Sequence, residues 1–506
     1  MVELVTGLDD VDAILFDIGG TLVAEASPGT AVADLEPRAF EGVPELLRSL
    51  AQHHRLGAVT NTAVMREADV RALLTTIGID DLLEVVVTSS DVGAEKPDPA
   101  PLLHALQRMS AEPGRTLYVG DRDIDREAAH AAGLRFAATD RGVGDALDRV
   151  RLAAGGAFAT AAAAVAPLDE RAMAAAAARH DRLTKPPGSL GRLEALGVHL
   201  AGIAGTSPPP VSTPVAVAVF ASDHGVVAAG VTPWPQDVTV QMVANFVRGG
   251  AAINAIAAQV GASVCVVDVG VAGHVSQFST VRHHKVRAGT RDLSMGPAMT
   301  AAEARAALDA GAATAAALIA EGNRLLVTGD MGIGNTTASA AIIAALTGRS
   351  ASDVTGRGTG IDDTMLAHKR EIVAGAVART AGWLDPVSVL SEVGGFEIAA
   401  LAGFVVGGAA GGVPVLVDGV IALAGLLVAD ALVPGVRNRC IAGHRSTEPG
   451  ATVALEHLGL TPLLELDLRL GEGTGACLAV PLVQAAARVL RDMATFEEAA
   501  VSERDT

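Results

Sequence analysis

The chain has 506 residues, of which 50% are hydrophobic and only 3% aromatic, and a formal net charge of -19. This length predicts two to four domains, with cores built from small and aliphatic side chains. The negative charge argues against nonspecific nucleic-acid binding and against an anionic membrane surface. The three cysteines, Cys265, Cys440 and Cys477, have no metal-ligand spacing, and the N-terminus is acidic. We therefore expect a reduced, cytoplasmic protein without a signal peptide.

Residues 1–150 alternate short apolar runs with amphipathic stretches, which predicts a parallel sheet covered by helices. The expected strands are AILF, RLGAV, LLEVVVT and TLYVG, which lead to Asp17, Thr60, Ser89 and Asp121. Functional groups gather at the carboxyl ends of parallel strands. We therefore expect a site at this edge of the sheet.

Five side chains near these strand ends suit phosphoryl chemistry. Asp17 is placed as a carboxylate nucleophile, while Thr60 and Lys96, in EKPDP, would hold phosphoryl oxygens. Asp17, Asp121 and Asp125, the last two in GDRDID, are candidate ligands of Mg²⁺, which prefers oxygen. In this order the set resembles the haloacid dehalogenase-like family over residues 10–140. The segment between Asp17 and Thr60 is too short for a large cap domain, so an open site is expected.

Gly19 departs from the pattern of that family, whose phosphatases usually have aspartate two residues after the nucleophile. Such an aspartate protonates the leaving oxygen and activates water, which is typically worth ~10²–10⁴-fold in rate. Glycine can do neither. The resemblance therefore implies Mg²⁺ and phosphate binding, with a weak or degenerate phosphatase activity.

An Ala-rich linker is expected at residues 151–167, followed by a second α/β domain at 168–506 with strands such as VAVAVF, SVCVVDVG, RLLVTG and PVLVDG. The uncharged stretch 398–417 is long enough to span a bilayer. Its glycines and Pro414 divide it, however, and no basic residues flank it. We predict a buried helix, a glycine turn and a short strand there.

The segment RLLVTGDMGIGNTTAS predicts a strand, glycine turns and a helix start. Backbone N–H groups at such a start bind anions, and glycines let a phosphate approach. The candidate binding residues are Gly332, Gly334, Asn335, Thr336 and Thr337. The loop lacks the Lys-Ser/Thr of a P-loop, and Thr337 replaces the third glycine of a dinucleotide fingerprint. From this loop alone, phosphate binding and an ordinary strand–helix turn both stay open.

Glu472 lies between two glycines in RLGEGTGA, directly before another expected helix. A partly desolvated carboxylate on such a loop suits a general base. A solvated loop glutamate is the alternative.

Eight motifs together resemble one family. They are LTKPPGSLGRLE, SDHGVVAAGVTPWPQDVTVQMVANFVRGGAAIN, VVDVGVAG, GTRDLSMGPAMT, GDMGIGNTT, EVGGFEIAALAG, GHRSTEPGA and RLGEGTGA. Over about residues 168–500 the chain resembles the nicotinate-nucleotide–dimethylbenzimidazole phosphoribosyltransferases. The resemblance implies a Rossmann-like domain with a smaller helical region from both of its ends, and a homodimer with active sites near the subunit interface. The expected fold class is thus α/β, with two Rossmann-like parallel-sheet domains.

The resemblance implies transfer of the phosphoribosyl group of nicotinate mononucleotide to 5,6-dimethylbenzimidazole. The products are α-ribazole 5′-phosphate and nicotinate, in cobalamin lower-ligand synthesis. The resemblance also implies that Glu472 is the general base and that the glycine loop and Ser446 hold the 5′-phosphate and ribose. Lys369 matches a position that orients or neutralises anionic groups, although an exposed helix lysine is equally compatible with the sequence. No cofactor is expected for the transferase, because the pyridinium leaving group is already cationic.

Gln241 and Trp234 are candidates for the benzimidazole pocket, although a core tryptophan is the commoner case. The catalytic candidate Asp330 stands where the family usually has glutamate, so its charge is kept and its reach is shorter. His224 and the pair His283 and His284 have no further ligands at a metal-binding spacing. We interpret them as structural or ribose-contacting.

Two other functions compete with the transferase. An NAD-binding oxidoreductase would use the glycine loop, and Asp353 falls about twenty residues after it, but no strand is expected to end there. A non-catalytic nucleotide sensor is disfavoured by the intact GEGTGA. The expected partners are small-molecule substrates and a second copy of the chain, with no nucleic acid and no membrane.

Overall fold

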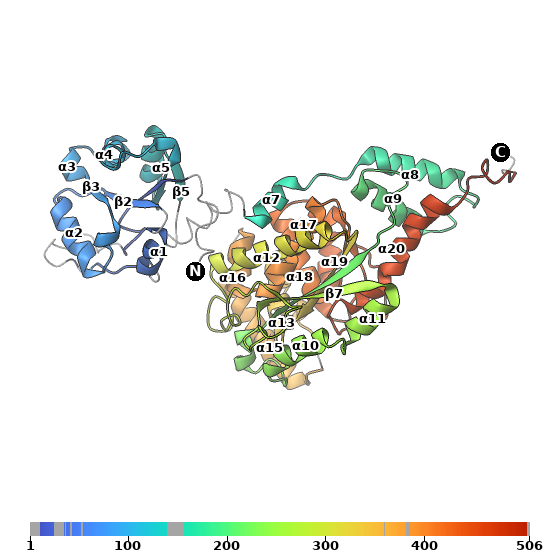
Figure 1. Ribbon diagram of the computed structural model, residues 1–506. Helices are drawn as coiled ribbons and strands as arrows, with labels where there is room; N and C mark the ends of the chain where they lie inside the picture. Colours follow the sequence, from blue (N-terminus) through green and yellow to red (C-terminus); the bar gives the residue numbers. More distant parts are fainter. Residues whose placement is uncertain are drawn as a thin grey trace. The chain divides into compact units, whose positions relative to one another are not determined.

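The computed structural model describes residues 11–24, 35, 37–40, 43–51, 54–138, 156–358, 360–380 and 385–502. The chain divides into two compact units, Met1–Gly156 and Ala157–Thr506 (Figure 1). Each unit contains a sheet whose paired strands all run parallel, with helices on both faces. The predicted α/β class with two parallel sheets is confirmed.

The first unit has a five-stranded sheet in the order β3-β2-β1-β4-β5. Its strands are β1 (Ala13–Phe16), β2 (Arg55–Thr60), β3 (Val85–Thr88), β4 (Thr116–Gly120) and β5 (Arg135–Ala138). Its helices are α1 (Val43–Leu50), α2 (Glu67–Thr76), α3 (Ser89–Val92), α4 (Ala100–Met109) and α5 (Asp123–Ala131), with 3-10 turns η2 (Asp80–Leu82) and η3 (Pro113–Arg115). All four strands predicted for this unit are present, and β5 was not predicted.

Alternate strand residues of the first unit point to opposite faces of the sheet, as the two-residue period requires. Leu56 and Ala58 of β2 pack in one apolar cluster with α1 and α2. Val59 of the same strand packs in a second cluster with α4 and α5. Both faces are therefore covered, and the carboxyl ends of the strands share one edge.

The second unit has a six-stranded sheet in the order β11-β10-β9-β6-β7-β8. Its strands are β6 (Val215–Ser222), β7 (Ala262–Gly270), β8 (Arg282–His283), β9 (Leu325–Met331), β10 (Val415–Val417) and β11 (Cys440–Ala442). Its helices are α7 (Ala157–Ala164), α8 (Glu170–Arg182), α9 (Arg192–Ala204), α10 (Asp237–Val247), α11 (Ala252–Val260), α12 (Ala301–Ala320), α13 (Asn335–Thr347), α14 (Ala351–Val354), α15 (Asp363–Arg379), α16 (Pro386–Val393), α17 (Phe396–Ala410), α18 (Val420–Leu432), α19 (Pro449–Leu458) and α20 (Thr474–Asp492), with 3-10 turns η4 (Gly225–Ala229) and η5 (Val436–Arg439).

Different helices cover the two faces of this sheet. Residues of α9, α10, α11 and α20 share one apolar cluster with β6, β7 and β9. On the other face α17 contacts β6 and β9, where the rings of Phe220 and Phe404 meet edge to face at 5.3 Å. Helices α8, α9 and α20 also pack on one another through small side chains, Ala172, Ala176 and Ala201, beside Leu490. The expected helical region from both ends of this unit is present.

Helix α17 lies against α12 at a distance that only glycine allows. A Cβ on Gly311 would lie 1.8 Å from the carbonyl oxygen of Ala400, and one on Gly403 would lie 1.9 Å from that of Leu308. The stretch 398–417 therefore forms a buried helix, a glycine turn and strand β10, as predicted. Among the described residues, no helix combines the length and the apolar character needed to cross a membrane.

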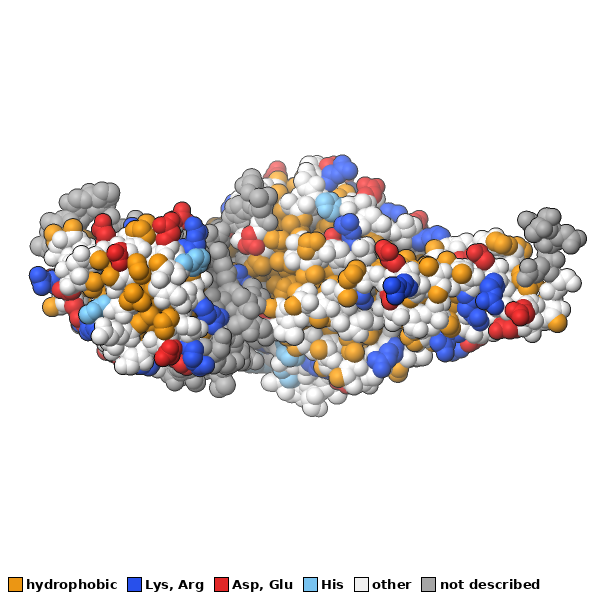
Figure 2. All heavy atoms as spheres, turned by 90° about the horizontal axis from the view of Figure 1, so that it is seen from above, with side chains coloured by type: hydrophobic (Ala, Val, Ile, Leu, Met, Phe, Trp, Pro, Cys, Tyr) orange, Lys and Arg blue, Asp and Glu red, His pale blue; other side chains and the backbone are white. Residues whose placement is uncertain are grey.

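Acidic and basic side chains are interspersed over both units on the face that Figure 2 shows. Among the described residues visible there, they do not gather by sign into a broad basic surface. This face therefore lacks the basic footprint that nucleic-acid binding requires.

Residues 157–164 form helix α7 in place of the expected linker. Phe158 is buried, its N–H donates to Asp309 Oδ1 at 2.8 Å, and α7 contacts α12 and α17. Alanine is the best helix former and is also common in flexible segments, so composition did not distinguish the two. Residues 151–155 of the expected linker lie outside the described residues.

These contacts predict that α7 stabilises the second unit. We expect a fragment of residues 156–506 to unfold at a higher temperature than one of residues 168–506, measured by circular dichroism. In the longer fragment, Phe158→Ala should lower the free energy of unfolding by up to about 3 kcal/mol, because a buried ring is removed. Equal melting temperatures for the two fragments would contradict this role of α7.

Candidate functional site

The glycine loop of the second unit begins where β9 ends, at Met331, and α13 begins at Asn335. Gly334 has a φ of +94°, a conformation that glycine adopts without steric cost. A Cβ on Gly332 would lie 2.4 Å from the carbonyl oxygen of Ser222, so the loop lies directly against the end of β6. The predicted strand, glycine turn and helix start are all present.

A cavity of about 400 Å³ opens at this edge of the sheet, within the size range of small-molecule sites. Its lining includes the predicted residues Trp234, Asp330, Gly332, Asn335, Thr336, Ser446 and Glu472. A smaller pocket of about 50 Å³ shares Trp234, Gly332, Asn335 and Thr336 with it and adds Gly334, Thr337 and Lys369. The fold thus brings together residues that lie far apart in the sequence.

Gln241 is not among these lining residues. It is exposed on α10, whereas Val238 and Met242 of the same helix line the cavity. Val238 and Met242 are four residues apart and share one face of the helix. The chain therefore places apolar side chains where the sequence suggested an amide.

Glu472 is buried at the cavity wall, with 6% of its surface exposed. Its φ is +63°, which is rare for a residue with a side chain. Burial raises the pKa of this carboxyl above its usual value; the Ile253 N–H, 3.4 Å from Oε2, opposes the shift and the charge of Asp418 adds to it. The alternative of a solvated loop glutamate is therefore wrong, and the group is suited to accepting a proton.

Asp330 is also buried at the cavity wall. Its Oδ2 accepts a hydrogen bond from Asn335 Nδ2 at 3.0 Å, and its Oδ1 has no partner. Burial, together with the negative charges of Asp418 and Glu397, raises the pKa of this carboxyl well above its usual value. Asp330 therefore holds a proton more strongly than an exposed aspartate does.

Lys369 lies on α15 with only 2% of its surface exposed, so the alternative of an exposed helix lysine is wrong. Its Nζ donates to Thr336 Oγ1 at 2.8 Å and lies 3.5 Å from the carbonyl oxygen of Gly356. Burial lowers its pKa to about 8, against the opposing charge of Glu448. An ammonium group beside the start of α13 adds to the anion-binding character of that helix end.

Three charged or ionisable residues that sequence reasoning missed also line the cavity: His444, Glu448 and Arg469. Glu448 Oε1 accepts the N–H of Gly358 at 2.7 Å, and Arg469 Nη1 donates to the carbonyl oxygen of Gly358 at 2.8 Å. All three lie within the motifs GHRSTEPGA and RLGEGTGA or directly beside Ser446 and Glu472. Their position in those motifs was the signal available in the sequence.

His224 has a structural role beneath the glycine loop. It is fully buried, and its Nε2 lies 2.6 Å from Glu397 Oε1. Burial alone would lower its pKa, but the negative charge of Glu397 raises it above the usual value. His283, by contrast, is an exposed residue of β8, and neither it nor His284 lines the cavity.

Asp353 does not fit a dinucleotide site. It lies on the short helix α14, where the sequence suggested a loop, and no strand ends there. It lines neither of the two pockets. The acidic residue expected at a strand end in a dinucleotide fold is therefore missing at this position.

The first unit has a separate buried cluster at the carboxyl end of its sheet. Lys96 Nζ lies 2.6 Å from Asp17 Oδ1 and from Asp125 Oδ1, and 2.8 Å from the hydroxyl of Tyr118. Burial raises the pKa of Asp17 to about 6, although Lys96 opposes the shift. Thr60 ends β2, and the neighbouring Asn61 bonds both the N–H and the carbonyl oxygen of Lys96.

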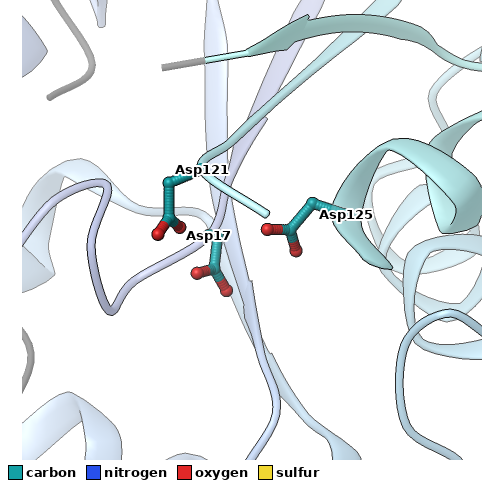
Figure 3. A group of neighbouring side chains, drawn as sticks. All are labelled: Asp17, Asp121 and Asp125. Carbon is teal, nitrogen blue, oxygen red and sulfur yellow. The ribbon is translucent and has the colours of Figure 1, made fainter. Parts of the chain in front are cut away.

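Asp17, Asp121 and Asp125 point toward one another (Figure 3). One oxygen from each lies within 4.8 Å of the others, and in the described part of the chain they are the only such group of acidic, histidine or cysteine side chains. Asp17 Oδ2 is buried without a partner. Because a hard divalent cation takes carboxylate oxygens, the three residues fit Mg²⁺.

The loop between Asp17 and Thr21 contains two glycines with different constraints. Gly20 has a φ of +79°, and a Cβ there would lie 2.2 Å from Asp121 Oδ2. Gly19 is outside the left-handed region and partly exposed. The structure therefore requires glycine at position 20, while the backbone at position 19 admits a side chain.

Comparison with known proteins matches each unit to a family. Residues 165–501 match the family model described as phosphoribosyltransferase, and residues 29–139 match the one described as haloacid dehalogenase-like hydrolase. The second match begins after Asp17 and Gly19, so it does not test those two positions.

Close relatives cover the second unit over nearly their whole length. The nicotinate-nucleotide–dimethylbenzimidazole phosphoribosyltransferase of Salinispora tropica is 54% identical over 357 residues, which are 68% of this chain and 98% of that protein. The enzyme of the same name from Thermus thermophilus is 51% identical, over 66% of this chain and 99% of that protein. The crystal structure of CobT from Thermus thermophilus aligns over all of its own chain and 66% of this one, with a TM-score of 0.65. The chain therefore belongs to the nicotinate-nucleotide–dimethylbenzimidazole phosphoribosyltransferase family and carries a haloacid dehalogenase-like unit before that domain.

Proposed function

We propose that the second unit transfers the phosphoribosyl group of nicotinate mononucleotide to 5,6-dimethylbenzimidazole, giving α-ribazole 5′-phosphate and nicotinate for the lower ligand of cobalamin. One observation carries the proposal. The buried carboxylate of Glu472 and the anion-binding loop at Gly332 share a single cavity of about 400 Å³. The reaction needs a proton acceptor and a phosphate site that lie no further apart than the length of one nucleotide.

Each step of this reaction has a group to perform it. A ring nitrogen of dimethylbenzimidazole attacks ribose C1′, and the bond from C1′ to the nicotinate nitrogen breaks with its electron pair going to that nitrogen. The N–H proton of the attacking ring passes to Glu472. The loop, the start of α13 and the Lys369 ammonium hold the 5′-phosphate. Trp234, with Val238 and Met242, forms an apolar wall for the flat base.

We further propose that the protein acts in the cytoplasm as a homodimer. All three cysteines are free thiols, which suits a reducing compartment. Large apolar side chains, Trp234 and Leu470, are 48% and 58% exposed although they line the cavity. A second copy covering the cavity mouth would remove this apolar surface from water.

For the first unit we propose a slow, Mg²⁺-dependent phosphatase acting on α-ribazole 5′-phosphate or a related phosphate ester. The favouring observation is that Lys96 orients Asp17 beside two further carboxylates, in a site suited to phosphate and metal. Asp17, Asp121 and Asp125 would hold Mg²⁺, which would neutralise phosphoryl oxygens. Asp17 would attack phosphorus, and the ester oxygen would leave with the electron pair of the broken P–O bond. Because Gly19 supplies no acid or base, that oxygen takes its proton from water, and an unassisted water then releases phosphate from Asp17.

Glu472→Gln should lower the kcat of nicotinate release by about 10²-fold or more, because the amide cannot accept the proton. Binding of nicotinate mononucleotide, measured by calorimetry, should stay within a few-fold of the parent. In the parent, kcat/KM should fall as pH falls through a pKa above the usual glutamate value near 4.5, since only the ionised carboxylate is a base. A parent chain that binds the nucleotide but never releases nicotinate would instead indicate a sensor.

Asp121→Asn should weaken Mg²⁺ binding to the full chain at least about tenfold, because one of three carboxylate ligands is lost. Asp123→Asn is the matched control. It lies two residues further on, at the first position of α5, but its side chain is 79% exposed and pairs with Arg126. Isothermal calorimetry with MgCl₂ measures both. If both variants bind like the parent, the three aspartates are not the metal site.

Gly19→Asp should raise phosphatase activity at least about tenfold, by supplying the missing acid and base. Asp17→Asn should abolish it. Phosphate release from α-ribazole 5′-phosphate and from an aryl phosphate measures both effects. Should the two variants and the parent all stay at background on both substrates, the first unit is not a phosphatase.

A further inference from the structure

Asp418 follows β10 and is fully buried, but it does not line the cavity. Its carboxylate is bonded to the start of α20: Oδ2 accepts the N–H of Gly473 at 3.1 Å, and Oδ1 accepts the N–H of Ala476 at 2.8 Å. Gly473 is the N-cap residue of α20 and has no side chain to satisfy these groups. Asp418 therefore caps α20 from a distant part of the chain, as a local aspartate would.

The surroundings of Asp418 hold its carboxylate in one place. Its own N–H donates to Thr328 Oγ1 on β9 at 3.0 Å, and His444 Nε2 lies 3.2 Å from Oδ1. A Cβ on Gly475 would lie 2.1 Å from His444 Cδ2, so α20 begins directly against that imidazole. Asp418 thus connects β9, β10, the segment after β11 and α20.

Glu472 immediately precedes the residue that Asp418 anchors. Its left-handed backbone persists only where the surroundings impose it. On one side Gly329 of β9 gives it room, since a Cβ there would lie 2.7 Å from the carbonyl oxygen of Glu472. On the other side the bonds from Gly473 and Ala476 to Asp418 fix the chain.

We propose that Asp418 is a positioning residue for the transfer reaction, which holds Glu472 in its left-handed conformation with the carboxylate directed into the cavity. The inference rests on the proposed role of Glu472 as the base. Asp418 itself touches neither substrate, because it lies behind the cavity wall. Its place in the fold is the point where the sheet edge and the start of α20 meet.

A second consequence is electrostatic. The negative charge of Asp418 raises the pKa of Glu472, after the larger effect of burial. Other ionisable groups also face Glu472 or line the same cavity: Asp330 from β9, His444 and Glu448 from the segment after β11, and Arg469 from its own loop. Removing the charge of Asp418 also lowers the pKa of Asp330 and of His444, and both changes partly offset the loss of negative charge near Glu472.

The test is Asp418→Asn in the full chain, which keeps the size of the side chain and removes its charge and one acceptor. We expect kcat for nicotinate release to fall at least about tenfold while KM for nicotinate mononucleotide stays within a few-fold, because the phosphate loop is untouched. The decrease of kcat/KM at acidic pH (the acid limb of the pH profile) should move to lower pH, because the pKa of Glu472 is lower without the negative charge of Asp418. Hydrogen exchange should increase more in residues 470–478 than in the rest of the second unit.

The matched control is Asp385→Asn, which removes the charge of another capping aspartate. Asp385 accepts the N–H groups of Val387 and Ser388 at the start of α16 and lines neither pocket. Its rate and pH profile should match the parent. Asp418→Glu is the second variant. It keeps the negative charge but displaces the carboxylate oxygens, so kcat should fall while the acid limb of the pH profile stays at the same pH.

Several results would overturn the inference. The first is an Asp418→Asn enzyme with the parent kcat. The second is an Asp418→Asn enzyme whose kcat is lower but whose acid limb does not move. If Asp418→Asn does not fold, the third is an Asp418→Glu enzyme with the parent kcat. Failure of the proposed function looks different, because the parent would then release no nicotinate. A Glu472→Gln enzyme with the parent kcat would show that Glu472 is not the base, and the positioning role of Asp418 would be overturned with it.

Discussion

At the carboxyl edge of the six-stranded sheet, four of the buried carboxylates interact electrostatically, since the charges of three raise the pKa of the fourth, Asp330. They are Asp330, Glu397, Asp418 and Glu472. Burying a charge is costly unless it is paired or neutralised. Glu397 pairs with His224, Asp418 receives two N–H groups of α20, and the raised pKa values of Asp330 and Glu472 reflect groups without such compensation. Two proton-binding groups are thereby left facing the cavity.

The first unit meets the same constraint in another way. Its buried Asp17 and Asp125 share one cation, Lys96, and the third carboxylate, Asp121, lies at the more open side. Charge there is balanced by an ammonium, whereas in the second unit burial raises the pKa of Asp330 and of Glu472. The proposed metal and phosphate site thus has its carboxylates around a cation, and the proposed proton-accepting site has carboxyl groups with raised pKa values.

The sequence predicted the features that depend on local pattern. Apolar runs of four or more residues gave strands β1 to β4, β6, β7, β9 and β10, and the glycine-flanked Glu472 and the loop at Gly332 lie at the cavity as expected. Strands β8 and β11 have two and three residues and lie in no apolar run of four, whereas β10 lies within the longer run VPVLV. Burial of Lys369 and the exposure of Gln241 depend on how α15 and α10 pack, which no local pattern specifies. The role of Asp418 could not be predicted from local pattern, because its partners lie more than fifty residues later.

The central claim is that one chain carries a proton-accepting transferase site and a separate metal-dependent phosphate site. The most direct measurement incubates the full chain with nicotinate mononucleotide and dimethylbenzimidazole and follows nicotinate, α-ribazole 5′-phosphate and α-ribazole by liquid chromatography. In EDTA we predict that nicotinate and α-ribazole 5′-phosphate form in equal amounts, and that Mg²⁺ then allows slow conversion to α-ribazole. No nicotinate release under either condition, or release that requires Mg²⁺, would contradict the account.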